Sequence, residues 1–412
     1  MRSLDAFIPP SGPIRTLCLS HISKTVGNGI LWSMSVLYFT REVGIPADKV
    51  GLALTVGAAG GLLAAVPAGR LADARGARNV TVLLLCLLGL FAWGYPLVGG
   101  FVGLLVVSVL VISVETSTDA TINALIAGLV PAQERVLASS YLRAASNISI
   151  MAGAALGGVG LYLDSDPVYL GLLLGSGVLF VVAGLAYLFV PQVPPVEHTG
   201  DGSIWPVLRD VPYAAASFLN TILIMNSGIL LVALPIWISE HTEAPAWLFP
   251  ALVIVNTIAV VLLQVRLSQG SSDVPGGGRA MRLAGFLLAA SCLLFAVTAG
   301  VPVWIAVLLL LAGAVVHVMG EMLHAVGSWA YGFGLAPEHA QGQYQGLFAM
   351  SSQLGQMVTP VLAAVLLTQL GAGGWLVFAV VFAATGAVAP AVGRWALRTR
   401  VPADLAPAEG SR

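Results

Sequence analysis

The sequence predicts an all-α membrane protein with twelve transmembrane helices in two pseudo-symmetric six-helix halves. Of its 412 residues, 58% are apolar and 9% are charged, whereas a soluble globular protein carries about 25% charged residues. Long apolar segments recur along the whole chain, and each is bounded by Gly, Pro or charged residues. Because a transmembrane helix needs about 20 apolar residues, twelve helices use about 240 and leave the rest for helix ends and loops.

The first half of the chain is expected to form six helices, one from each apolar segment. The first segment is too long for a signal-peptide core, so we interpret it as a retained transmembrane helix. The expected helices lie near residues 15–40, 47–69, 79–99, 102–130, 136–163 and 168–190.

The second half is expected to form six more helices after a linker rich in proline and polar residues at 191–212. Residues 1–190 and 213–400 are therefore predicted to be two bundles, and residues 401–412 a tail. The six expected helices lie near residues 213–239, 245–268, 282–300, 302–335, 342–371 and 374–397.

Weak internal similarity supports two related halves. Moving the sequence by half its length places Leu129-Val130-Pro131 on Leu335-Ala336-Pro337 and Glu115 on Glu321. In transporters built from such repeats, the substrate site lies between the repeats near the middle of the membrane.

The distribution of the 18 basic residues predicts that both chain termini are cytoplasmic. In this topology only Arg41 and Lys49 lie outside the cell, and Lys24 and Arg143 lie within the membrane. The reverse topology would violate the positive-inside rule, so we expect a multi-pass protein of the plasma (cytoplasmic) membrane. The fourteen basic residues expected on the cytoplasmic side are Arg2, Arg15, Arg70, Arg75, Arg78, Arg135, Arg209, Arg266, Arg279, Arg282, Arg394, Arg398, Arg400 and Arg412.

Charge and cysteine content exclude several classes of partner. A net charge of −1 provides no basic surface for nucleic acid. Cys18, Cys86 and Cys292 each lie in an apolar segment without CxxC spacing, so neither a disulfide framework nor a thiolate metal site is expected. We expect no cofactor and no resident metal.

The segment GRLADARGAR, between the second and third expected helices, carries the most specific motif. It resembles the signature of the same loop in the major facilitator superfamily, Gly-x-Leu-x-Asp-x-x-Gly-x-Arg, at every specified position. The resemblance implies the major facilitator fold and a gating loop in which Asp73 and Arg78 latch the two halves in the outward-facing state. The alternative is that these residues are ordinary cytoplasmic loop charges. The implied gating residues are Gly69, Asp73, Arg75, Gly76 and Arg78.

Gly153, Gly157 and Gly158, in the helix at 136–163, resemble the antiporter motif Gly-Pro-x-x-Gly-Gly of that superfamily's drug exporters. Ala154 stands where the motif has proline. The same glycines would allow close helix packing without any role in exchange. The arginine of the family's fourth helix is absent, and Arg143 is the residue that would supply this charge.

Five charged residues are expected within the membrane, where each costs about 2.5 to 3.5 kcal/mol. Arg143 and Asp119 lie at similar depths, so we expect them to pair. Lys24 is then left to approach either Glu115 or Glu321. Static ion pairs that hold helices together are the alternative to a transport role.

Glu321 is the predicted principal proton-coupling residue, because burial favours its neutral form. His317 and His324 flank it on one helix face and are expected to take part in the coupling by modulating it. Glu115 is its counterpart in the repeat, and Asp119 is the third candidate carboxylate. Two imidazoles and one carboxylate on a helix face also leave open a transported divalent metal.

The remaining polar residues fall on the helices that line the central cavity in the resembled family, the first, fourth, seventh and tenth. Two of them, Trp32 and Tyr331, are equally compatible with simple packing. The expected substrate-cavity residues are His21, Lys24, Asn28, Trp32, Asn220, Asn226, Ser328 and Tyr331.

These observations predict a transporter, not an enzyme, that exports a small amphipathic organic molecule by alternating access in exchange for protons. It is expected to work as a monomer in the lipid bilayer. The alternatives are a proton-coupled importer of a small nutrient, a divalent-metal transporter and a non-transporting membrane receptor.

Overall fold

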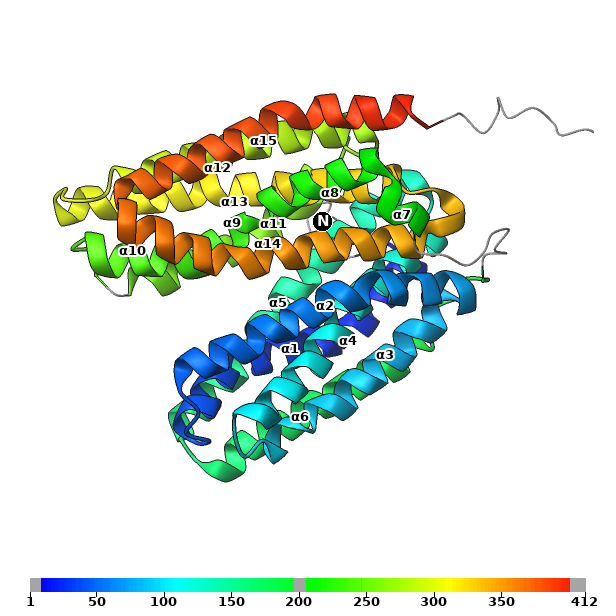
Figure 1. Ribbon diagram of the computed structural model, residues 1–412, viewed down its shortest axis with the longest axis horizontal. Helices are drawn as coiled ribbons and strands as arrows, with labels where there is room; N and C mark the ends of the chain where they lie inside the picture. The colour runs from blue at the N-terminus through cyan, green and yellow to red at the C-terminus, as the bar shows by residue number, and fades with distance from the viewer. Residues whose placement is uncertain (1–8, 196–204, 246, 401–412) are drawn as a thin grey trace, which may run out of the picture.

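The computed structural model describes residues 9–195, 205–245 and 247–400, which form helices joined by short loops (Figure 1). Arg2, Arg412, the predicted tail at 401–412 and residues 196–204 of the predicted linker lie outside these ranges. The all-α membrane fold predicted from composition is confirmed. Eleven helical segments of the described chain are long and apolar enough to cross a membrane. The 29-residue helix α1 (Pro13–Arg41) is also long enough, although it carries several polar residues.

The first half contains six long helices. Pro13 fits the first turn of α1, because a first-turn residue needs no backbone N–H donor. Asp164 ends α5 in the left-handed conformation. The helices after α1 are α2 (Ala47–Arg75), α3 (Ala77–Ala92), α4 (Phe101–Leu129), α5 (Arg135–Leu163) and α6 (Asp166–Tyr187).

The second half contains six further membrane segments and one short helix, α7 (Trp205–Arg209). Its first segment, Val211–His241, is interrupted by a π-helical turn at Ile229–Ala233. The helices of the second half are α8 (Val211–Leu223), α9 (Met225–Gly228), α10 (Leu234–His241), α11 (Leu248–Leu267), α12 (Val274–Ala296), α13 (Val303–Gly334), α14 (Gln341–Leu370) and α15 (Ala372–Arg398).

Two helix boundaries differ clearly from the sequence prediction. Helix α12 begins well before residue 282, because the Asp273 side chain caps Gly276 and the glycines that follow pack closely on α13. Helix α2 continues past residue 69 to Arg75 and ends at Gly76, which has a φ of 88°. Most of the segment expected to be a gating loop is therefore the last turns of α2.

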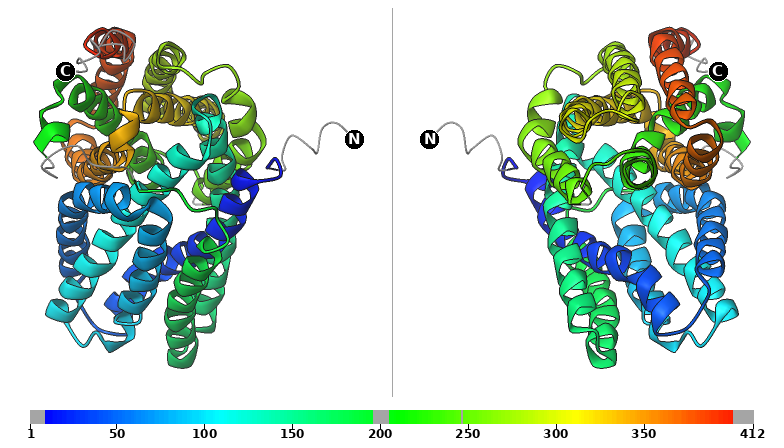
Figure 2. Two further views of the ribbon diagram at one scale, coloured as in Figure 1. Left: turned by 90° about the vertical axis from the view of Figure 1, so that its right-hand side faces the viewer. Right: turned by 90° about the vertical axis from the view of Figure 1, so that its left-hand side faces the viewer.

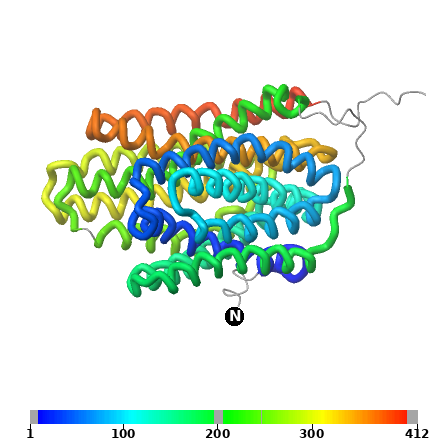
Figure 3. Tube along the Cα trace, turned by 60° about the horizontal axis from the view of Figure 1, so that its bottom comes forward, coloured from blue at the N-terminus to red at the C-terminus, as the bar shows by residue number. Residues whose placement is uncertain are grey.

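Two large apolar cores lie in the two halves. One is built mainly from α1–α6 and the other mainly from α8–α15. In the end-on views most helices of the first half, drawn blue to green, lie apart from those of the second half, drawn green to red (Figure 2). The helices of both halves run roughly along the same direction (Figure 3).

The halves meet at one end of the molecule and separate toward the other. We call the meeting end the linker end; it contains Gly76, Tyr187 and Val211. Helices α2 and α14 lie close together there and diverge toward the opposite end (Figure 1). The two helices therefore form a V that opens away from the linker end.

Candidate functional site

Three adjoining cavities lie between the halves, with volumes of about 520, 240 and 180 Å³. The largest is lined by α1, α2, α4, α5 and α14, and the second by residues of α4 and α5 facing residues of α8, α13 and α14. Among the described residues, Asp119 alone lines all three. The cavities therefore form one central site, with Asp119 at its centre.

Lys24 of α1 forms an ion pair with Asp119 of α4. The Lys24 side chain is 3% exposed, whereas that of Asp119 is 54% exposed. The expected pairing of Asp119 with Arg143 is wrong. That prediction rested on the depth of the two residues in the membrane. The rotation of each helix about its axis decides which side chains face each other, and Asp119 faces α1.

Arg143 of α5 forms an ion pair with Glu321 of α13. Asn256 of α11 donates a hydrogen bond to the second oxygen of Glu321 at 2.7 Å. Lys24, expected to approach a glutamate, pairs with Asp119 instead. The Arg143–Glu321 pair thus joins the two halves.

Glu115 of α4 accepts a hydrogen bond from Asn28 of α1 at 2.7 Å. No ion pair forms at Glu115 among the described residues. It lines the 520 Å³ cavity together with Asn28, His21 and Trp32. The His21 ring is hydrogen bonded to the Tyr187 hydroxyl at 3.1 Å, and Trp32 is 58% exposed. The structure therefore places all of the expected cavity residues of α1 around this cavity.

His324 links α13 to the segment that begins with α8. Its two ring nitrogens contact Asn220 at 3.0 Å and Asn226 at 3.2 Å. His324, Asn220 and Ser328 line the 240 Å³ cavity, whereas Asn226 is buried and holds the His324 ring.

His317 and Tyr331 lie apart from the central site. His317 is buried and contacts Ser291 of α12 at 3.4 Å, and Tyr331 is buried and donates to the Ala389 carbonyl of α15 at 2.6 Å. The expectation that Tyr331 lines the cavity is wrong, since it packs into the second half. Glu321, His317 and His324 contact different helices, and no three His, Cys, Asp or Glu side chains of the described chain are placed to hold a metal ion.

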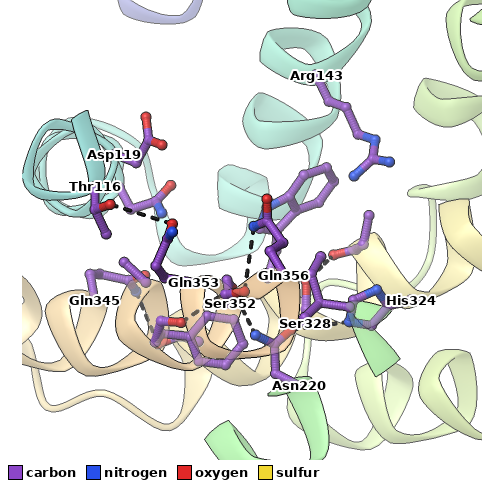
Figure 4. A pocket seen from close by; sticks show the side chains of 17 residues that line it. Thr116, Asp119, Arg143, Asn220, His324, Ser328, Gln345, Ser352, Gln353 and Gln356 are labelled. Atoms are coloured by element: carbon purple, nitrogen blue, oxygen red, sulfur yellow. Dashed lines mark hydrogen bonds between the residues drawn. The ribbon is translucent and has the colours of Figure 1, made fainter. Parts of the chain in front are cut away.

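Helix α14 contributes polar residues that sequence reasoning missed. Gln345, Ser352, Gln353 and Gln356 line the 240 Å³ cavity opposite Asp119 (Figure 4). Thr116 of α4 donates to Gln353 at 3.4 Å across the two halves. The signal in the sequence was the polar run from Ser351 to Gln356 inside an otherwise apolar segment.

Asp73 connects the halves at the linker end. Its two carboxylate oxygens accept hydrogen bonds from the backbone N–H groups of Gly342 at 2.7 Å and Gln343 at 2.9 Å, in the first turn of α14. A carboxylate at this position also interacts favourably with the helix dipole. Arg75 is exposed. Arg78 donates to the Val190 carbonyl and Gln192, within the chain segment after α6, so these hydrogen bonds do not reach the second half as expected.

Gly69 permits the close crossing of α2 and α14. A Cβ atom at Gly69 would overlap the Gly342 carbonyl, and a Cβ atom at Gly342 would overlap the Gly69 carbonyl. Only glycine at both positions allows the two backbones to approach this closely.

The glycines of α5 have different surroundings. Gly153 packs against the backbone of α1 near Val26 and Gly29, and Gly157 packs against Ser33. Gly158 has open space where a Cβ atom would lie. The expected packing role fits Gly153 and Gly157, whereas Gly158 has no packing role.

The fold has close structural relatives of low sequence identity. The human organic anion transporter MFSD10 (TETRAN) has 16% identity and a TM-score of 0.68, with 92% of this chain and 98% of that one covered. A bacterial homologue of the iron transporter ferroportin in the outward-facing state has 15% identity and a TM-score of 0.68, with 94% and 100% covered. The transporter FucP in the outward conformation has 14% identity and a TM-score of 0.70, with 95% and 99% covered. At these low sequence identities, the three similarities show a shared fold and nothing further.

The sequence comparison gives the family. No curated protein matches the chain. The family described as Major Facilitator Superfamily matches residues 17–355. Because the match covers well over half of the chain, the protein belongs to the Major Facilitator Superfamily of membrane transporters.

Proposed function

We propose that the protein is a proton-coupled antiporter that exports a small amphipathic organic molecule. The observation that carries this proposal is the Arg143–Glu321 pair, which joins the halves beside the central cavity. A titratable carboxylate within the membrane-spanning region is expensive and calls for a function. Protonation of Glu321 would leave Arg143 without its negative partner and weaken this link between the halves.

The positive-inside rule supports an orientation in which the linker end is cytoplasmic. In that orientation the contacts of Asp73 and Gly69 with α14 close the cytoplasmic side, and the cavity faces outward. The similarity to two transporters described in outward conformations supports the same assignment.

Exchange requires that substrate and proton bind in alternation, with Glu321 ionised when substrate binds and neutral after the substrate has left. In the outward-facing state the substrate leaves, and a proton from outside binds the Glu321 carboxylate. The link to Arg143 then weakens, so α5 and α13 can separate at the linker end. Release of the proton to the cytoplasm and binding of a new substrate restore the pair and return the protein to the outward-facing state.

Transport in proteoliposomes with an acidic lumen tests the direction and the coupling. Ethidium, a permanent cation with a large apolar surface, serves as the probe. An antiporter moves ethidium into the lumen as protons leave, and we expect Glu321→Gln to abolish this accumulation. Glu240→Gln, the same change at an exposed residue of α10, should leave it intact.

Two results would contradict the proposal. Movement of the probe in the same direction as the protons would indicate symport and therefore a nutrient importer. Full accumulation by Glu321→Gln would show that Glu321 is structural, and the coupling would then rest with Glu115 or Asp119.

A further inference from the structure

The two larger cavities differ in their side chains. We call the 520 Å³ cavity the wide chamber and the 240 Å³ cavity the amide chamber. The wide chamber is lined by apolar groups that include Trp32, Leu54 and Met357 and by polar residues, among them the charged Lys24, Glu115 and Asp119. A planar or aromatic ring system fits such a lining, since most ligand sites bury apolar surface and use few polar groups to set orientation.

Eight of the 17 residues that line the amide chamber are uncharged and polar, and six are apolar. Gln345, Ser328 and Ser352 face it (Figure 4), Asn123 also lines it, and amides carry both donors and acceptors. Hydroxyl groups also act as both donor and acceptor. Most of these amides already hydrogen-bond within the protein, and a ligand part with several hydroxyl groups would add further hydrogen bonds, whereas an apolar part would add none.

Asp119 stands where the two chambers meet. Lys24 contacts only its Oδ1 atom, and Oδ2 takes no hydrogen bond from the described residues. The side chain is 54% exposed to the cavities. An open carboxylate oxygen in a partly enclosed site is an acceptor for a protonated amine, with which it forms a strong charge-assisted hydrogen bond.

One carboxylate of the site has no cationic partner among the described residues. Two carboxylates, Asp119 and Glu321, are paired with Lys24 and Arg143, and Glu115 has only the Asn28 amide. With all five groups ionised, the site carries one excess negative charge. A ligand with a single positive charge would balance it.

We infer that the transported molecule is a bipartite amine: an apolar ring system joined to a hydroxylated, amine-bearing group of the amino-sugar kind. The ring system would lie in the wide chamber, the amine at Asp119 Oδ2 and the hydroxyl groups in the amide chamber. Asp119 would be the residue that selects the amine. This inference rests on the proposed transport function and names the substrate class of the same site.

Binding of three related fluorescent probes to the purified protein tests it, with fluorescence anisotropy as the readout. Daunorubicin carries an apolar ring system and an amino sugar, N-acetyldaunorubicin keeps the sugar without the charge, and the daunorubicin aglycone lacks the sugar. We expect wild type to bind them in this order, with Kd rising about tenfold at each step.

Two substitutions should each remove one of the two tenfold differences in Kd. Asp119→Asn is expected to equalise daunorubicin and its N-acetyl derivative, and Gln353→Met, at the junction of the chambers, to equalise the N-acetyl derivative and the aglycone. Asp48→Asn, the same change at an exposed residue at the start of α2, should keep both steps. Where Asp119→Asn fails to fold, Lys24→Met/Asp119→Asn removes the carboxylate without leaving Lys24 unpaired.

Equal binding of all three probes by wild type would overturn the inference. So would a full preference for daunorubicin over its N-acetyl derivative in the variant without the Asp119 carboxylate. Neither result bears on ethidium–proton exchange. An error in the inferred substrate class can therefore be distinguished from an error in the proposed transport function.

Discussion

Asp73 of α2 caps α14 at Gly342, with 2.7 Å between Oδ1 and the backbone nitrogen, so a side chain of the first half completes a helix of the second. The second oxygen binds the next N–H group, that of Gln343, at 2.9 Å. The first N–H groups of a helix have no partner within the helix, and a carboxylate satisfies them while it complements the helix dipole. The contact stabilises only the arrangement in which the two halves meet at the linker end.

Asp73→Asn is predicted to favour opening of the linker end. The amide keeps the side-chain shape but loses the charge and one acceptor oxygen. Loss of a helix cap costs about 1 kcal/mol, about a fivefold change in the ratio of closed to open protein. The measurement is the rate at which a membrane-impermeant maleimide labels Ser139→Cys, at the buried linker-end part of α5, in a background without the three native cysteines.

The labelling rate should rise about fivefold in Asp73→Asn. Asp48→Asn, at the far end of the same helix, should not change it. An unchanged rate in Asp73→Asn would show that the Asp73 cap does not hold the linker end closed.

Gly69→Ala should separate α2 from α14. The added methyl group would overlap the Gly342 carbonyl, and backbone cannot move aside as a flexible side chain can. Arg75 and His339 are both exposed at the linker end. Double electron–electron resonance between spin labels at these two positions would report a longer distance. Gly51→Ala is the matched control, because open space surrounds that position on the same helix. Identical distance distributions for the two variants would refute the close-crossing role of Gly69.

The Lys24–Asp119 pair predicts an asymmetry in stability. Asp119→Asn leaves a 3%-exposed lysine without a partner, whereas Lys24→Met leaves a carboxylate that is 54% exposed to the cavity. An unpaired buried charge costs about 3 to 5 kcal/mol, and an exposed pair contributes about 1 kcal/mol or less.

Thermal unfolding in detergent measures this asymmetry. Asp119→Asn should have the lower Tm, and the double variant Lys24→Met/Asp119→Asn should recover most of the loss. Equal losses in the two single variants would contradict the different burial of the partners.

The helices were predictable because apolar length and charged boundaries follow directly from the physics of the bilayer. The start of α12 was missed because Gly276, Gly277 and Gly278 resemble a loop in sequence, although Gly277 and Gly278 pack closely on α13. The extension of α2 to Arg75 was missed because the charged residues near its end were interpreted as a loop.

The residues of the site were more predictable than their partners. Sequence position gives the depth of Asp119 and Arg143 in the membrane, but the rotation of α4 and α5 depends on packing across the whole bundle. The contribution of Gln353 was not predicted, because α14 is not one of the four helices that the family resemblance places around the cavity. Asn256, which binds Glu321, is one of four polar residues in a mainly apolar helix, and its spacing does not single it out.

Proton release by the purified protein tests the central claim, that Glu321 couples substrate to protons, most directly. Ethidium is added to wild type and to Glu321→Gln in weakly buffered detergent solution, and the pH change is recorded with an indicator dye. The account predicts release from wild type and from Glu240→Gln, and none from Glu321→Gln. Undiminished release from Glu321→Gln would contradict it.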